Sequence, residues 1–154
     1  MTSTLNATGA AARAADVLLR SLGGRSVMLR MPAPATPNDA TEQLGLAQPA
    51  FQDAPLAPVV YRKARASVSL NTPGAPRSRS DRGSTRYELL VSASAVQALI
   101  ADLQSPSASI LFADALGIFA DGVLLQIVSA SEEQVYAQPY VYRLILEAPQ
   151  ARAI

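Results

Sequence analysis

The sequence predicts a mainly β fold, a small antiparallel β-barrel or sandwich with two short helices and long loops. Three observations predict it. Several short segments alternate apolar and polar residues as strands do, glycine, proline and Asp-Gly turn signals separate them, and only two segments have helical features. The chain has 154 residues, enough for a substantial core, so we expect a single domain over residues 1–154.

A helix and a strand are the first elements expected, after a flexible N-terminus over residues 1–9. Residues 10–22 are alanine-rich and end in leucines, and Gly23-Gly24 is a helix stop signal. Residues 26–31 then alternate as a strand with every second residue apolar.

A proline-rich arm, residues 33–58, is expected next. It has no sustained hydrophobic period, and a long irregular segment in a small domain is typical of a functional arm or lid. The arm either packs back on its own domain or docks on a neighbouring subunit. If it docks, its apolar side chains form the candidate subunit interface: Leu44, Leu46, Phe51 and Leu56.

Strands expected over residues 59–65 and 86–92 flank the main concentration of positive charge. Between Arg62 and Arg86, seven basic residues and one acidic residue give a net charge of +6, whereas the other residues together carry −5. We expect residues 71–85 to form a basic loop, which is either an ordinary solvated loop or a contact with nucleic acid or an acidic protein surface. The candidate contact residues are Arg77, Arg79, Arg82 and Arg86.

The remaining chain is expected to contain one helix and mostly strands. Ser94-Ala-Val-Gln97 has the form of a capping box, and apolar residues follow at helical spacing to about Gln104. Asp121-Gly122 is a hairpin turn signal. Tyr136, Tyr140 and Tyr142 are evenly spaced, so Tyr140 and Tyr142 should share a face of the last strand, and the three tyrosines are either core or interface residues. We expect strands over residues 109–112, 117–120, 123–130 and 140–147, with a loop over residues 131–139.

The chain contains no His, Cys or Trp. This excludes Ser-His-Asp and Cys-His catalysis and the usual zinc ligand sets. No nucleotide-binding or nucleophile-elbow motif occurs, so we expect no enzyme and no catalytic, cofactor-binding or metal-binding residues. No apolar run approaches the roughly 20 residues of a membrane span, and the N-terminus lacks signal-peptide features. We therefore expect synthesis in a cytoplasm and no membrane partner.

The later part of the chain resembles a known family. A Tyr-Glu-Leu-Leu-Val-Ser-Ala-Ser segment over residues 87–94 leads into the capped helix, the Asp-Gly hairpin follows, and Gln138-Pro-Tyr-Val-Tyr-Arg-Leu-Ile-Leu-Glu147 is the closing strand. This succession, over roughly residues 57–149, is similar to the head-closure, or head-tail joining, proteins of long-tailed bacteriophages and prophages.

The resemblance implies a structural protein of the virion neck, assembled in a bacterial cytoplasm. Such a subunit would join a ring of six or twelve copies, with portal and adaptor proteins above it and tail proteins below it, and would help to retain packaged double-stranded DNA. The arm and the basic loop go beyond the pattern of that family. Two alternatives stay open: a tail-terminator or other neck ring protein, and a stand-alone basic β-barrel that binds nucleic acid.

Overall fold

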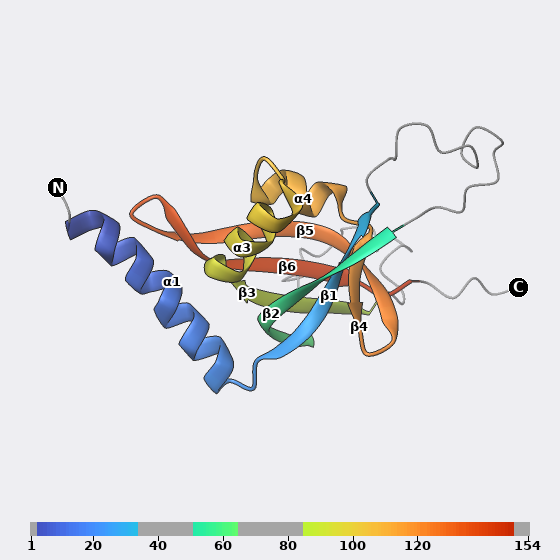
Figure 1. Ribbon diagram of the computed structural model, residues 1–154. Helices are drawn as coiled ribbons and strands as arrows, with labels where there is room; N and C mark the ends of the chain where they lie inside the picture. The colour runs from blue at the N-terminus through green and yellow to red at the C-terminus, as the bar shows by residue number, and fades with distance from the viewer. Residues whose placement is uncertain (1–2, 34–50, 65–84, 150–154) are drawn as a thin grey trace, which may run out of the picture.

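The computed structural model describes residues 3–33, 51–64 and 85–149, and these residues share one core. Six antiparallel strands close into a barrel in the order β1-β2-β3-β6-β5-β4 (Figure 1). The predicted mainly β fold is confirmed, and it takes the form of a barrel. The elements are α1 (Ser3–Ser21), β1 (Arg25–Pro32), β2 (Phe51–Lys63), β3 (Arg86–Ser92), α3 (Ala93–Leu103), α4 (Ala108–Asp114), β4 (Gly117–Ala120), β5 (Val123–Val135) and β6 (Gln138–Glu147).

Aliphatic side chains fill the barrel, because successive residues of a strand point to opposite faces of the sheet. The pattern predicted for the first strand is confirmed, since Val27, Leu29 and Met31 of β1 are all buried. Every strand contributes to this interior, and α3 and α4 add five apolar side chains to the same cluster: Ala93, Val96, Leu99, Leu111 and Phe112.

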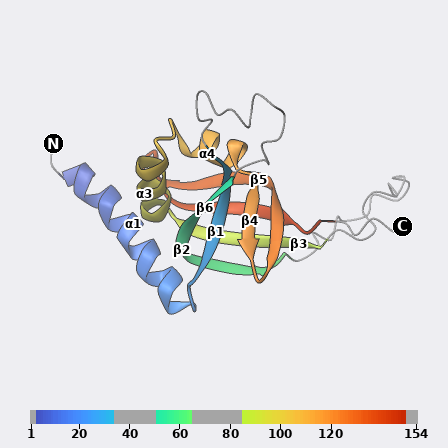
Figure 2. The ribbon, with the colours of Figure 1, turned by 45° about the vertical axis from the view of Figure 1, so that its right-hand side comes forward.

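Helix α1 lies outside the barrel. It ends before Gly23-Gly24, as predicted, but it begins at Ser3, so residues 3–9, expected to be a flexible N-terminus, are helical. Figure 2 shows its first half extending away from the barrel. The second half buries Ala15 and Leu19 and leaves Val17 and Leu18 exposed, and Leu22, which follows the helix, is exposed as well.

Strand β2 is longer than the sequence predicted, because it begins at Phe51. The last eight residues of the expected arm therefore belong to the barrel. Ala54 and Leu56 are buried while Pro55 between them is exposed, which is the period of a strand. The prolines concealed this pattern, since proline is normally excluded from all but edge strands. Residues 51–56 pair with β1 on one side, and β3 joins β2 only from Val59 onward.

The β5–β6 hairpin also differs from the prediction. β5 continues to Val135, so most of the loop expected over residues 131–139 is strand. The chain turns at Tyr136 and Ala137, whose φ angles are 50° and 59°. The polar sequence Ser131-Glu-Glu-Gln134 shows no apolar alternation because this part of the hairpin is exposed.

The strand predicted over residues 109–112 is wrong, because these residues lie in α4. The side chain of Ser107 accepts a hydrogen bond from the backbone N–H of Ile110 at 3.3 Å and so caps the helix. The cap of α3 is likewise Ser92 and not Ser94, since Ser92 accepts from the N–H of Ala95 at 3.4 Å. The structure therefore contains three helices in its described part, where two were expected.

Two glycines are required by the geometry of β4 and β5. The predicted Asp121-Gly122 turn is confirmed, with φ angles of 50° and 80°, as a two-residue hairpin needs. Gly117, with φ 154°, lies so close to β5 that a Cβ atom there would be 2.5 Å from the carbonyl oxygen of Leu125. Any side chain at position 117 would push β4 and β5 apart.

Candidate interaction surfaces

The candidate site residues named from the sequence fall in different places. Leu44, Leu46, Arg77, Arg79 and Arg82 lie outside the described residues. The other three, Phe51, Leu56 and Arg86, belong to the barrel strands.

Leu56 is not an interface residue. Its side chain is only 1% exposed and lies in the barrel core, so no neighbouring subunit can reach it. The prediction failed because it treated every apolar residue of the expected arm alike, whereas the alternation along β2 directs Leu56 inward.

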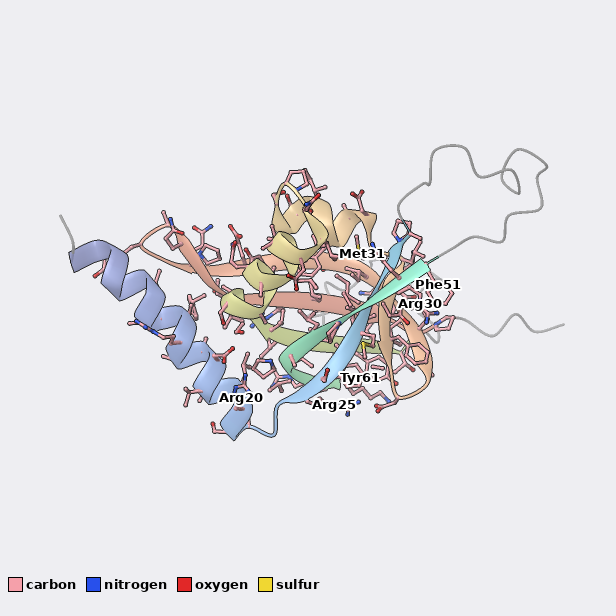
Figure 3. The ribbon with its side chains drawn as sticks, viewed as in Figure 1. Arg20, Arg25, Arg30, Met31, Phe51 and Tyr61 are labelled. Atoms are coloured by element: carbon pink, nitrogen blue, oxygen red, sulfur yellow. The ribbon has the colours of Figure 1, made fainter. Side chains whose placement is uncertain are left out.

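Phe51, by contrast, is accessible, with 52% of its surface exposed. The guanidinium of Arg30 lies 3.8 Å from the centre of its ring, and Figure 3 shows both side chains at the same end of the barrel. Arg30 also donates two hydrogen bonds of 2.8 Å to the carboxylate of Asp53, and these bonds lower the pKa of Asp53. Pro32 pairs with Phe51, so the segment between β1 and β2 leaves and re-enters the barrel at this point.

A basic face occupies the outer side of β2, β3 and β6. Glu88, in the middle strand, accepts a hydrogen bond of 2.7 Å from Arg62 on β2 and forms an ion pair of 2.9 Å with Arg143 on β6. Its side chain is 13% exposed, whereas those of Arg62 and Arg143 are 63% and 46% exposed. The carboxylate therefore sits beneath two cations that remain open to solvent.

The basic face continues to the ends of the strands that flank residues 65–84. Lys63 is exposed, and Arg86 lies 3.9 Å from Glu147. With Arg62 and Arg143 the face has four basic side chains against the two carboxylates of Glu88 and Glu147, which leaves it a net charge of +2. A shallow hollow of about 530 Å³ opens between Arg62, Lys63, Glu88 and Arg143. Of the four basic residues of this face, only Arg86 was predicted from the sequence to be a contact residue.

A buried hydroxyl–carboxylate contact fastens α1 to the barrel. Ser92 is fully buried, and its hydroxyl donates a hydrogen bond of 2.6 Å to Asp16. This bond is the main reason why the pKa of Asp16 is lowered. The same hydroxyl caps α3, so both its donor and its acceptor capacity serve the fold. Because Ser92 is fully buried, no substrate can reach its hydroxyl, and the residue serves the fold.

A groove of about 850 Å³ runs between α4 and β5. Residues 126–132 line one wall, and Ser107, Ser109 and Phe112 lie on the other. Tyr142 forms part of its floor, and its ring is 5.9 Å from that of Phe112. Burial, followed by the contact with Glu132, raises the pKa of Tyr142.

The three C-terminal tyrosines have separate roles. Tyr142 is 5% exposed and belongs to the core, Tyr140 is half-buried, and Tyr136 is 77% exposed at the hairpin tip. The core interpretation is confirmed for Tyr142, and the interface interpretation stays a prediction for Tyr136.

Comparisons of the chain with protein-family models, with curated proteins and with solved structures found no match. Among the described helices, none is long and apolar enough to cross a membrane. The part of the chain that the structure describes also contains no cluster of three or more acidic residues placed to hold a metal ion.

Proposed function

We propose that the chain is a structural protein of the neck of a long-tailed bacteriophage or prophage particle. It would act without catalysis, as a ring subunit that joins the DNA-filled head, with its portal and adaptor proteins, to the tail. The observation that carries the proposal is the basic face at the end of the barrel from which residues 65–84 depart. A ring around a DNA channel must meet either phosphate or the acidic surfaces of adjoining rings, and arginines satisfy both needs.

The geometry of the basic face suits contacts that do not depend on sequence. Glu88 orients the guanidinium groups of Arg62 and Arg143 while leaving their outer N–H groups in solvent. Such groups can bind phosphate oxygens without reading bases. Residues 65–84, which join β2 to β3 in the sequence, contain four arginines and one aspartate, a net charge of +3. Each phosphate that the chain neutralises would release counterion, so the contact should weaken steeply with salt.

The decisive experiment replaces Arg77, Arg79, Arg82 and Arg86 with serine in the strain that produces the particles. The subunit should still fold, because the substitutions remove no apolar side chain and Arg86, the one described residue among the four, lies outside the core cluster. The yield of filled, tailed particles in electron micrographs should drop at least ten-fold. The matched control replaces the same four residues with lysine, which keeps the charge and should retain most of the yield. A wild-type yield from the serine variant would overturn the proposed role of these four arginines.

A second experiment tests the neck assignment itself. Particles produced without this protein should separate into unattached tails and heads that have lost DNA. Antibody labelling of intact particles should place the protein at the head–tail junction. Labelling at the far end of the tail tube, or normal tailed particles in its absence, would exclude head closure.

The basic face also favours a second candidate, a stand-alone barrel that binds nucleic acid. That function predicts nucleic acid in the purified protein and the absence of the protein from particles. Mass spectrometry of purified particles therefore separates the two candidates, because a neck protein must be present in stoichiometric amounts. A tail terminator would also be present, and the labelling experiment distinguishes it.

A further inference from the structure

The outer edge of β5 is open beyond the point where β4 ends. β4 pairs with β5 only at Val123–Leu125, whereas β6 pairs with β5 from Gln126 to Val135. In the described part of the chain, β5 therefore has one strand neighbour over most of its length. Its other edge presents backbone N–H and C=O groups, and such an edge is a template for pairing with another chain.

The groove beside α4 follows this open edge. Residues 126–132 line it without a gap. Since alternate side chains of a strand point to opposite faces, a groove on one face of the sheet would be lined by every second residue. Lining by seven consecutive residues indicates that the groove exposes the edge itself. Seven residues of strand span about 23 Å, long enough for a short extended peptide.

The charge of the groove lining is acidic. Of the described residues that line the groove, only Glu132 is charged. Glu133 follows it on the same exposed strand. The groove therefore favours a cationic occupant.

The same charges argue against pairing between two copies of β5. An antiparallel pair in which Glu132 of one copy faced Glu133 of the other would place like charges directly opposite one another, and this destabilises a strand pair. The segment of this chain over residues 34–50 is also unsuitable, because its charged residues are Asp39 and Glu42.

We infer that the open edge of β5 is a docking site for an extended, positively charged segment of a different protein, which adds to the barrel as a further strand. Backbone hydrogen bonds along residues 127–133 would supply the pairing. Glu132 and Glu133 would select basic side chains, and the serines of the groove would accommodate small ones. This inference stands on the fold and the charges of the groove and does not require the neck function.

The test uses the full isotope-labelled chain and two synthetic peptides of eight residues. One peptide alternates lysine with valine, and the other alternates glutamate with valine. The lysine peptide should slow hydrogen exchange of outward-facing amides between Ile127 and Glu133 and shift their NMR signals. Raising the salt concentration from 50 to 300 mM should weaken its binding. The glutamate peptide should leave the same amides unchanged.

Two variants separate the site from general charge attraction. The double variant Glu132→Lys, Glu133→Lys should bind the lysine peptide at least ten-fold more weakly and should now prefer the glutamate peptide. Asp102→Lys, on α3 and outside the groove, should keep its affinity within two-fold. Far-ultraviolet circular dichroism checks that each variant is folded.

Three results would overturn the inference. Equal binding of both peptides would show that charge does not select the occupant. Protection of residues 127–133 in the dilute protein alone would show that another part of the same chain already covers the edge. Protection that rises with protein concentration would identify a second copy as the occupant.

Discussion

Replacing Leu56 with Ala tests whether the second half of the expected arm is part of the barrel. The leucine side chain is 1% exposed, and the substitution removes three carbon groups. At about 0.8 kcal/mol for each buried group, the lost transfer free energy is about 2.4 kcal/mol. The cavity left behind raises the total loss to about 3 to 5 kcal/mol. Domains of this size are stable by about 5 to 15 kcal/mol, so the variant should lose a large part of its stability.

Urea unfolding followed by far-ultraviolet circular dichroism measures this loss, since the chain has no Trp for fluorescence. Phe51→Ala is the matched control on the same strand. Because Phe51 is half exposed and mainly covers Arg30, its removal should cost only about 1 kcal/mol. Equal, small losses from both variants, together with a loss of subunit assembly from Leu56→Ala, would refute the core assignment and restore Leu56 as an interface residue.

Three further predictions concern α1, the β4–β5 contact and the basic face. Because Ser92 lowers the pKa of Asp16, the ionised carboxylate stabilises the fold above its unfolded pKa of 3.8, and this contribution is lost as pH falls through the lowered folded pKa. Asp16→Asn should lower the unfolding free energy at pH 7 by about 1 kcal/mol and should remove the loss of stability that comes from protonating Asp16. Urea unfolding at several pH values that gave the same pH profile for variant and wild type would contradict this prediction. Gly117→Ala should lower the unfolding free energy by more than about 2 kcal/mol, because the new Cβ would meet the backbone of β5. Gly122→Ala should lower it by only about 1 kcal/mol, from backbone strain alone, because a Cβ there meets open space. Equal thermal midpoints for the two variants would contradict this prediction. Glu88→Gln should raise the affinity for a 30-base-pair DNA duplex several-fold at 50 mM salt, since it adds one net positive charge, and fluorescence anisotropy showing weaker binding would count against the basic face.

The sequence was sufficient for the fold class because the barrel interior has a clear two-residue period. The alternation in residues 26–31 and the Asp121-Gly122 turn both predicted local structure that the barrel contains. These signals are local, and each depends on residue types whose backbone preference is strong.

Other elements could not be predicted because their local signal was ambiguous or opposed by the tertiary structure. Residues 109–112 are a short apolar run that suits a strand or a helix equally, and only the cap from Ser107 and the burial of both Leu111 and Phe112 mark it as helical. The polar half of β5 is a strand because β6 pairs with it. Its own side chains gave no strand signal.

The residues of the basic face were harder to predict from the sequence, because they come from strands that are far apart in the chain. Clustering of charge in the sequence predicted a basic region, but the face on the barrel also includes Arg143, which lies 57 residues after Arg86 in the sequence. The ion pairs of Glu88 bring these strands' charges together. Only pairing of β3 with both β2 and β6 could reveal this arrangement.

The basic face and the groove use opposite sides of the same strand, β6. On β6, Arg143 points to the basic face while its neighbour Tyr142 lines the acidic groove, because adjacent residues of a strand face opposite sides. An acidic partner can therefore bind the basic face without covering the groove, and a basic partner can bind the groove without covering the basic face. High salt would weaken both contacts together and cannot tell them apart. Charge substitutions distinguish the two contacts, because Glu88→Gln alters the basic face alone and the substitutions Glu132→Lys and Glu133→Lys alter the groove alone. If both surfaces serve one assembly, either change should impair it, and each defect should be repaired only by a partner of altered charge at its own surface.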